Sequence, residues 1–402
     1  RIANDYQRKG VNCDRLDYCL AAISGAVSAI VDFYYVASPK ECKLLEWTDH
    51  QTEEFVTKVS NGIWKADERK RSVIQEQFHQ KMIGMDMRNS LLQKEDIPID
   101  CCLQNPPDSF EVAVKYLEKR FKVGYDSVRA SELKATSTRY LKDMKPINHH
   151  IKSLSHSPDV VGLLFSIVDQ FTSHSTFIDH NRIIHLTPKN NNSGLELRGG
   201  TFAGKILAGA VNWLGHLLSD IAGSSGAAGR GTGLCAPFME LLQLCPFSIK
   251  TKQDGEAVTV KISELVVEMF ENGYDFRFSV VQMLPVTLNE CMIRIIWGIR
   301  QMLQYNRSIS EILKDMNTSP DLHRMLLVGH GTLCVLDAGE AVIAGHGEAL
   351  NICLHLNFMA WLRLAFLGFK DVRQIWCGSK YDLEKMDYDM QCEWEKIAKN
   401  GI

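Results

Sequence analysis

The chain lacks several features that would place it in a common class of protein. Its 402 residues include 45 basic and 48 acidic side chains, with a formal net charge of −3, so no overall positive field indicates nucleic acid as a partner. None of its twelve cysteines forms a CxxC pair, and the neighbours Cys101 and Cys102 stand alone. We expect no signal peptide, and we expect reduced, mostly buried cysteines in a cytoplasmic protein.

Long uninterrupted apolar runs are also missing. No stretch of 18 or more residues is free of charge, and the best candidate for a membrane span, Tyr18 to Val36, contains Asp32. A span needs about 20 largely apolar residues. We therefore expect the apolar segments to be buried helices of a cytoplasmic protein, with peripheral or integral membrane association as the alternative. Asp32 is a candidate functional residue under either interpretation, because a carboxylate in an apolar segment is costly.

Familiar catalytic motifs and strand patterns are scarce. There is no GxSxG nucleophile elbow and no GxxxxGK[ST] phosphate loop. Residues 257–262 alternate like a strand, and residues 182–187 are either its partner or one arm of a short hairpin. Helical periodicity dominates elsewhere, as in residues 111–121, 263–272, 288–305 and 309–316. The pattern of residues 326–336 does not decide between a helix and a strand. The sequence predicts a mainly α fold, a helical bundle with minor β additions.

The chain does contain histidines and aspartates in apolar surroundings. One stretch holds His149, His150 and His156, and the apolar segment WLGHLLSD, about sixty residues later, holds His216 and Asp220. Residues four apart share a helix face, so His216 and Asp220 project together. A buried carboxylate is normally paired or bound to a metal. Three histidines and one aspartate can fill the coordination sphere of a divalent transition metal.

The spacing ranks the histidines of the first stretch. If residues 147–156 form a regular helix or turn before a cap at Ser157, His149 and His156 lie two turns apart on one face. His150 then faces the substrate or supports the ligands, and an irregular segment leaves the choice between His149 and His150 open. The alternative is that these histidines are hydrogen-bonded core residues without a metal.

Three segments follow one another along the chain: an apolar stretch ending at Asp32, the histidines up to Ser157, and Leu214 to Asp220 before Gly223. This order resembles the membrane-bound, metal-dependent hydrolase family regulated by the SOS repressor. Similar HxxxD helices occur in zinc-dependent phospholipase C-like proteins, which are also all-α. The resemblance covers about residues 18–36 and 146–233. It implies hydrolysis of a phosphoester-type bond and metal binding by Asp32, His149 or His150, His156, His216 and Asp220.

The chain departs from that family in its histidine spacing, which is longer, and in its C-terminal half, which lies outside the match. It also resembles a group of bacterial mobile-element proteins, and that resemblance implies no activity. Residues 223–233 are rich in glycine and carry Arg230. Such a loop can present N–H groups to an anion, and Arg230 can bind a phosphate with two hydrogen bonds. The alternative is a plain flexible connection.

Together these observations predict a metal-dependent phosphoester hydrolase that acts through metal-bound hydroxide. The metal is zinc, with manganese or iron as alternatives. The predicted ligands are Asp32, His149, His156, His216 and Asp220, and the predicted catalytic residues are Arg230 and His150. The competing hypothesis is a non-enzymatic helical binding protein, or a membrane-associated effector, encoded on a mobile element.

We expect three regions. Residues 1–45 and 146–240 should form the helical core that holds the metal site. Residues 46–145 should be a helical insertion, because they form a lysine-rich amphipathic region. Residues 241–402 should form a further mainly helical region whose role the sequence does not indicate.

Overall fold

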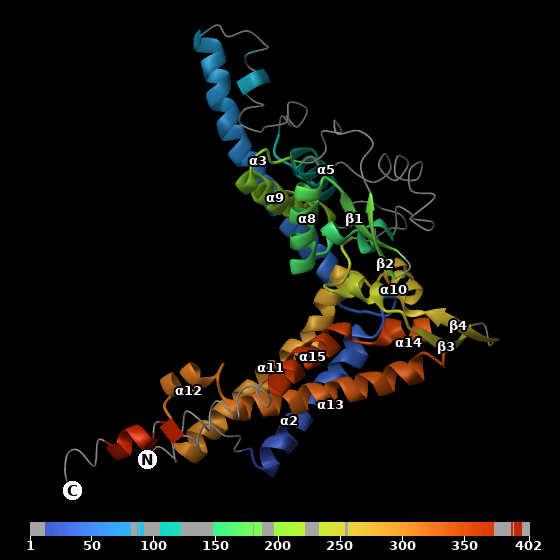
Figure 1. The fold of residues 1–402 in the computed structure, drawn as a ribbon, viewed down its shortest axis with the longest axis vertical. Coiled ribbons are helices and arrows are strands. Elements are labelled where there is room, and N and C mark those ends of the chain that lie inside the picture. The colour runs from blue at the N-terminus through green and yellow to red at the C-terminus, as the bar shows by residue number, and fades with distance from the viewer. Residues whose placement is uncertain are drawn as a thin grey trace. The chain divides into compact units, whose positions relative to one another are not determined.

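The computed structural model describes residues 13–81, 87, 89–91, 105–121, 148–179, 181–186, 197–221, 233–253, 256–373, 387–388 and 390–395. The fold is mainly α, as predicted (Figure 1). Its described strands form two antiparallel sheets of two strands each. The chain divides into two compact units. Unit 1 consists of residues 1–42, 282–346 and 355–402, and unit 2 of residues 43–281 and 347–354.

Unit 1 is built from apolar helices. They are α2 (Arg15–Val31) with the π-helical turn η1 (Asp32–Val36), most of α11 (Phe276–Tyr305), α12 (Ile309–Asp315), α13 (Pro320–Ala344) and α15 (Phe358–Arg373). α2 and α13 cross closely at two glycines. A Cβ atom at Gly25 would lie 2.2 Å from the carbonyl oxygen of Gly329, so no larger residue fits there. α13 is one continuous helix through Gly329 and Gly331, which settles the open choice for residues 326–336.

This packing differs from the expected division of the chain. The N-terminal segment belongs to the same unit as α13 and α15, and not to that of residues 146–240. The physical reason is the close backbone approach of α2 and α13 at their glycines, which apolar periodicity does not reveal. The cysteines of the described residues are all free thiols, but among them only Cys235 and Cys334 are buried, so the expectation of mostly buried cysteines was wrong.

Unit 2 contains the histidines of interest. Its elements are α3 (Leu45–Lys81), α5 (Phe110–Phe121), α7 (His149–Lys152), the 3₁₀ turn η4 (Leu154–His156), α8 (Val160–Thr172), β1 (Ser175–Asp179), β2 (Arg182–Leu186), α9 (Phe202–Asp220), the 3₁₀ helix η5 (Met239–Leu244), β3 (Ser248–Gln253), β4 (Glu256–Lys261), α10 (Ile262–Glu271) and nearly all of α14 (Ala349–His355). β4 pairs with β3, and β2 pairs with β1. Of the two alternatives for residues 182–187, the separate hairpin is therefore the correct one.

The helices α8 and α9 form the frame of the site. The N-cap residue of α8 is Asp159, whose carboxylate accepts hydrogen bonds from the N–H groups of Val161 and Gly162. The cap is thus two residues later than the Ser157 predicted from the sequence. α8 and α9 lie side by side (Figure 1), and the Ser166 hydroxyl donates to the Gly209 carbonyl at 2.8 Å. This contact fixes α9 against α8.

Candidate metal centre

The stretch that carries the first three histidines is not a regular helix. α7 is a single turn that ends at Ser153, which adopts an extended conformation and bridges to Phe177 of β1. The turn η4 then carries His156. The ring centroids of His149 and His156 lie 4.7 Å apart, and those of His150 and His156 lie 5.7 Å apart. The chain therefore brings all three imidazoles together, and the ranking that set His150 apart fails because the helix it assumed is broken.

Three polar contacts fix this irregular stretch. The Lys152 ammonium lies 2.8 Å from the Asp179 carboxylate, and both side chains are buried. The Gln243 amide donates to the Ile151 carbonyl at 2.6 Å. The Asn148 amide donates to the Glu271 carboxylate at 2.9 Å. Because β1, η5 and α10 all anchor the stretch, its histidines are held before any ligand arrives.

The HxxxD element contributes the other two side chains from the end of α9. His216 and Asp220 share one face of the helix, as predicted, and their Nδ1 and Oδ2 atoms lie 3.6 Å apart. The same Oδ2 atom lies 3.6 Å from Nδ1 of His150. The ring centroids of His156 and His216 are separated by only 4.1 Å. The two segments thus meet, although about sixty residues separate them in sequence.

A further hydrogen bond ties α9 to the histidine stretch. The indole N–H of Trp213 donates to the carbonyl of Ser157 at 2.9 Å. Trp213 lies one turn before His216 on α9, and Ser157 directly follows His156. The bond therefore connects the backbone of one predicted ligand to the helix that carries another.

The geometry suits a metal ion. The five side chains are 0–7% exposed. They form two groups whose ligand atoms lie within 4.8 Å of one another: one is His149, His150 and His156, and the other is His156, His216 and Asp220. A separation of 3.6 Å is longer than a hydrogen bond. Two donors on a tetrahedral zinc ion, with bonds of about 2.0–2.1 Å, lie roughly 3.3 Å apart.

The chemistry of the donors is also suitable. Imidazole and carboxylate ligands are those preferred by zinc, iron and manganese. Burial lowers the pKa of His150, and the Asp220 carboxylate opposes this effect only in part. A lowered pKa keeps the imidazole neutral near pH 7, and only a neutral imidazole can donate its lone pair to a metal. The residues present therefore fit a divalent metal ion.

The other predicted site residues lie elsewhere. Asp32 belongs to unit 1, where its Oδ1 accepts a hydrogen bond of 2.9 Å from the Asn357 amide, and it is in neither His/Asp group. Arg230 and residues 223–232 lie outside the described residues, so the glycine-loop hypothesis stays a prediction. Asp169 of α8 accepts hydrogen bonds from the backbone N–H and the hydroxyl of Thr176.

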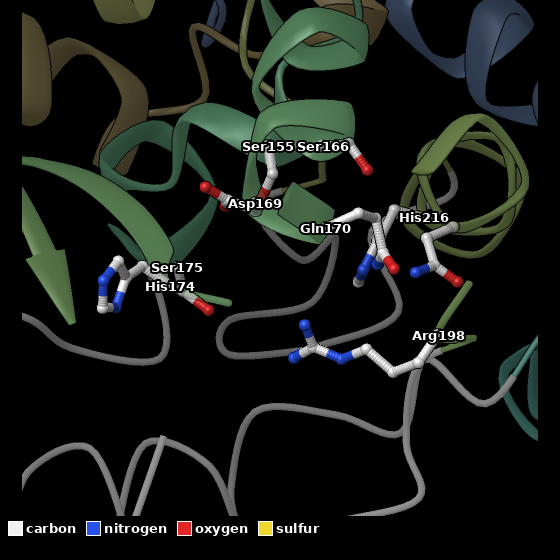
Figure 2. A pocket seen from close by; sticks show the side chains of 9 residues that line it. Ser155, Ser166, Asp169, Gln170, His174, Ser175, Arg198 and His216 are labelled. Atoms are coloured by element: carbon white, nitrogen blue, oxygen red, sulfur yellow. The ribbon is translucent and has the colours of Figure 1, made fainter. Parts of the chain in front are cut away.

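A small polar pocket opens beside this centre, with His216 in its wall (Figure 2). Sequence reasoning missed it, because its lining comes from separate elements and from the irregular segment before α9. Arg198 gave no signal in the sequence, since it follows a polar loop and belongs to no motif. The lining residues are Ser155, Ser166, Asp169, Gln170, His174, Ser175, Arg198, Asn212 and His216.

Comparison of the chain with models of known protein families, with curated proteins and with solved structures finds no significant match to any of them.

Proposed function

We propose that unit 2 is a metal-dependent hydrolase that acts on phosphoester-type substrates. The observation that carries the proposal is the meeting of His149, His150, His156, His216 and Asp220 in a buried cluster built from two distant segments. Four imidazoles crowded in an apolar interior repel one another once protonated, and a divalent metal removes this conflict by requiring them neutral. Zinc is the first candidate, with manganese or iron as alternatives.

A bound metal ion supplies a Lewis acid and lowers the pKa of coordinated water to about 7. The roles of the chain's own residues follow from the geometry. His156 belongs to both groups and would be the ligand that they share. Asp220 lies equally close to His150 and His216, so its charge orients both rings. The three side chains of one group would hold the ion and leave it accessible to water and substrate from the pocket beside His216.

Elemental analysis of the purified full chain tests the proposal. We expect about one or two equivalents of a divalent transition metal in the wild type. H216A and D220A should lose most of this metal, together with any hydrolysis of bis(p-nitrophenyl) phosphate. H185A replaces an exposed histidine of β2 in the same unit and should retain both. A wild type without metal after reconstitution, or full activity in H216A, would refute the proposal.

We further propose that unit 1 lies in a lipid bilayer. In the part of the chain that the structure describes, three helical stretches are long and apolar enough to cross a membrane, namely Arg15–Val36, Phe276–Tyr305 and Pro320–Ala344. α14 and α15 together pass the same test but are bent by 72° at their junction. A bent pair of this kind is a broken span or a re-entrant segment. Of the two alternatives left by the sequence, we favour membrane association over buried helices, because only 39% of each apolar window is buried.

The exposed faces are apolar. Ile23 of α2, Leu303 of α11 and Ile343 of α13 are 59, 80 and 76% exposed. Large apolar patches are rare on soluble monomers and mark partner or membrane surfaces. On the same faces the structure exposes Val27, Ile30, Ile295, Ile299, Val335 and Val342.

The apolar core of unit 1 also contains buried carboxylates that are hydrogen-bonded. The Asn357 amide donates to the buried Asp32, and its backbone N–H donates to the buried Asp337 at 3.0 Å. The Trp361 indole donates to the other oxygen of Asp337 at 2.8 Å. Carboxylates inside membrane domains face the interior and are hydrogen-bonded in this way. The arrangement supports a membrane-associated protein, whether or not unit 2 is an enzyme.

Membrane fractionation tests this second proposal. We expect the full chain in the membrane pellet after a carbonate or high-salt wash, and its release only by detergent. A monodisperse protein that is purified without detergent would contradict it. A protein that fractionates with membranes but binds no metal would instead favour the non-enzymatic effector.

A further inference from the structure

The backbone before α9 is held by side chains from both framing helices. The Asn212 amide makes two hydrogen bonds to Leu197, accepting from its N–H and donating to its carbonyl, each at 3.0 Å. The Gln170 amide donates to the same carbonyl at 3.1 Å and accepts from the N–H of Gly199 at 3.4 Å. Asn212 and Gln170 are themselves buried. Both neighbours of Arg198 are therefore fixed to α8 and α9.

The hydrogen bonds of Asn212 and Gln170 fix the backbone on both sides of Arg198, and the Arg198 side chain lines the pocket. Figure 2 shows it extending toward the space beside Gln170 and His216. Among the described residues no carboxylate forms an ion pair with Arg198. Asp169 is the one acidic residue among those that line the pocket, and both of its carboxylate oxygens accept hydrogen bonds from Thr176. An arginine with a fixed backbone and a free guanidinium is suited to bind an anion through two parallel hydrogen bonds.

We propose that Arg198 forms the anion-binding subsite of the centre and holds the phosphoryl group of the substrate beside His216. The inference rests on the proposed metal-dependent function and adds the substrate's recognition group. Asn212 lies four residues before His216 on α9, so the helix that carries a predicted ligand also fixes the backbone of Arg198. The pocket is small and opens to solvent, so the subsite offers no more than room for one small anionic group at its opening.

Inorganic phosphate is the probe. Its dissociation constant is measured by calorimetry on the full-length, metal-loaded wild type and on R198Q, with metal content determined on the same samples. R198Q should weaken phosphate binding about tenfold or more, since a charge-assisted hydrogen-bond pair is lost, and should keep its metal. R198K should recover only part of the affinity because an ammonium cannot form the two parallel bonds. R182Q, at an exposed arginine of β2, is the matched control and should bind as the wild type does.

The outcomes separate this inference from the proposed function. A metal-loaded R198Q that binds phosphate as tightly as the wild type overturns the role of Arg198 and leaves the metal centre standing. A wild type that takes up no metal overturns the proposed function itself. Loss of metal in R198Q would show a structural role and would also contradict the subsite. Glycerol phosphate in solution and phosphatidylglycerol in vesicles distinguish a free phosphoester from a lipid, and R198Q should weaken whichever binds.

Discussion

Glu240 of η5 provides a quantitative test of how the interior of unit 2 is built. The side chain is fully buried, and the Cys235 thiol approaches its Oε2 at 3.7 Å. Burial raises the pKa of Glu240 from its ordinary value of 4.5 to about 8, and the negative charge of Asp159 adds to the rise. At neutral pH the folded protein therefore keeps Glu240 protonated, whereas the unfolded chain ionises it.

The sign of the effect follows from proton linkage. Between pH 4.5 and 8 the folded state binds one proton more than the unfolded state at this residue, so its contribution to stability falls as the pH rises. Each pH unit in this window costs about 1.4 kcal/mol. The whole window is worth up to about 5 kcal/mol. E240Q replaces the neutral acid with a neutral amide of the same shape, so it removes this dependence.

Chemical unfolding at several pH values between 5 and 8.5 measures the difference. The stability of E240Q relative to the wild type should increase steadily across this range. E256Q, at an exposed glutamate of the same unit, should run parallel to the wild type. A constant difference between E240Q and the wild type from pH 5 to 8.5 would show that folding does not raise the pKa of Glu240, and would contradict this prediction.

Two further substitutions test the frame of the site. G209A should destabilise unit 2 by about 1–3 kcal/mol, because its Cβ would lie 2.7 Å from the α8 backbone. The control is G62A in α3, whose Cβ would meet nothing within 4 Å, so this variant should be neutral or slightly stabilising. Thermal unfolding compares the two, and equal effects would contradict the close α8–α9 crossing. K152M removes the ammonium beside the buried Asp179 carboxylate and should lower the free energy of unfolding by about 3–5 kcal/mol. The control K261M breaks the exposed pair with Glu264 and should lower it by less than about 1 kcal/mol. Equal losses in these two variants would argue against a buried ion pair.

Local pattern was sufficient to predict much of the fold. Apolar periodicity located α5, α10, α12 and the second half of α11, and the HxxxD spacing placed His216 and Asp220 on one face of α9. These predictions depend on neighbours within a few residues, where helix geometry alone decides which side chains meet. The meeting of the two histidine-bearing segments was also predicted, but from the chemistry of burying a carboxylate and not from topology.

Other features depend on tertiary contacts that the sequence does not display. The break at Ser153 depends on a bridge to Phe177 and on the Lys152–Asp179 pair, so the place of His150 beside Asp220 could not be derived from helical spacing. The close α2–α13 crossing depends on glycines far apart in the chain. The pocket with Arg198 also had no sequence signature. Its shape depends on hydrogen bonds from α8 and α9 to the backbone on both sides of Arg198.

X-ray absorption at the metal edge of the purified, metal-loaded protein identifies the atoms that bind the ion. We expect nitrogen and oxygen ligands at about 2.0–2.2 Å, with the outer-shell scattering of several imidazole rings. H216A and D220A should lose most of this signature. A spectrum dominated by sulfur at about 2.3 Å, which would place the metal at cysteines, or a spectrum without imidazole scattering would contradict it.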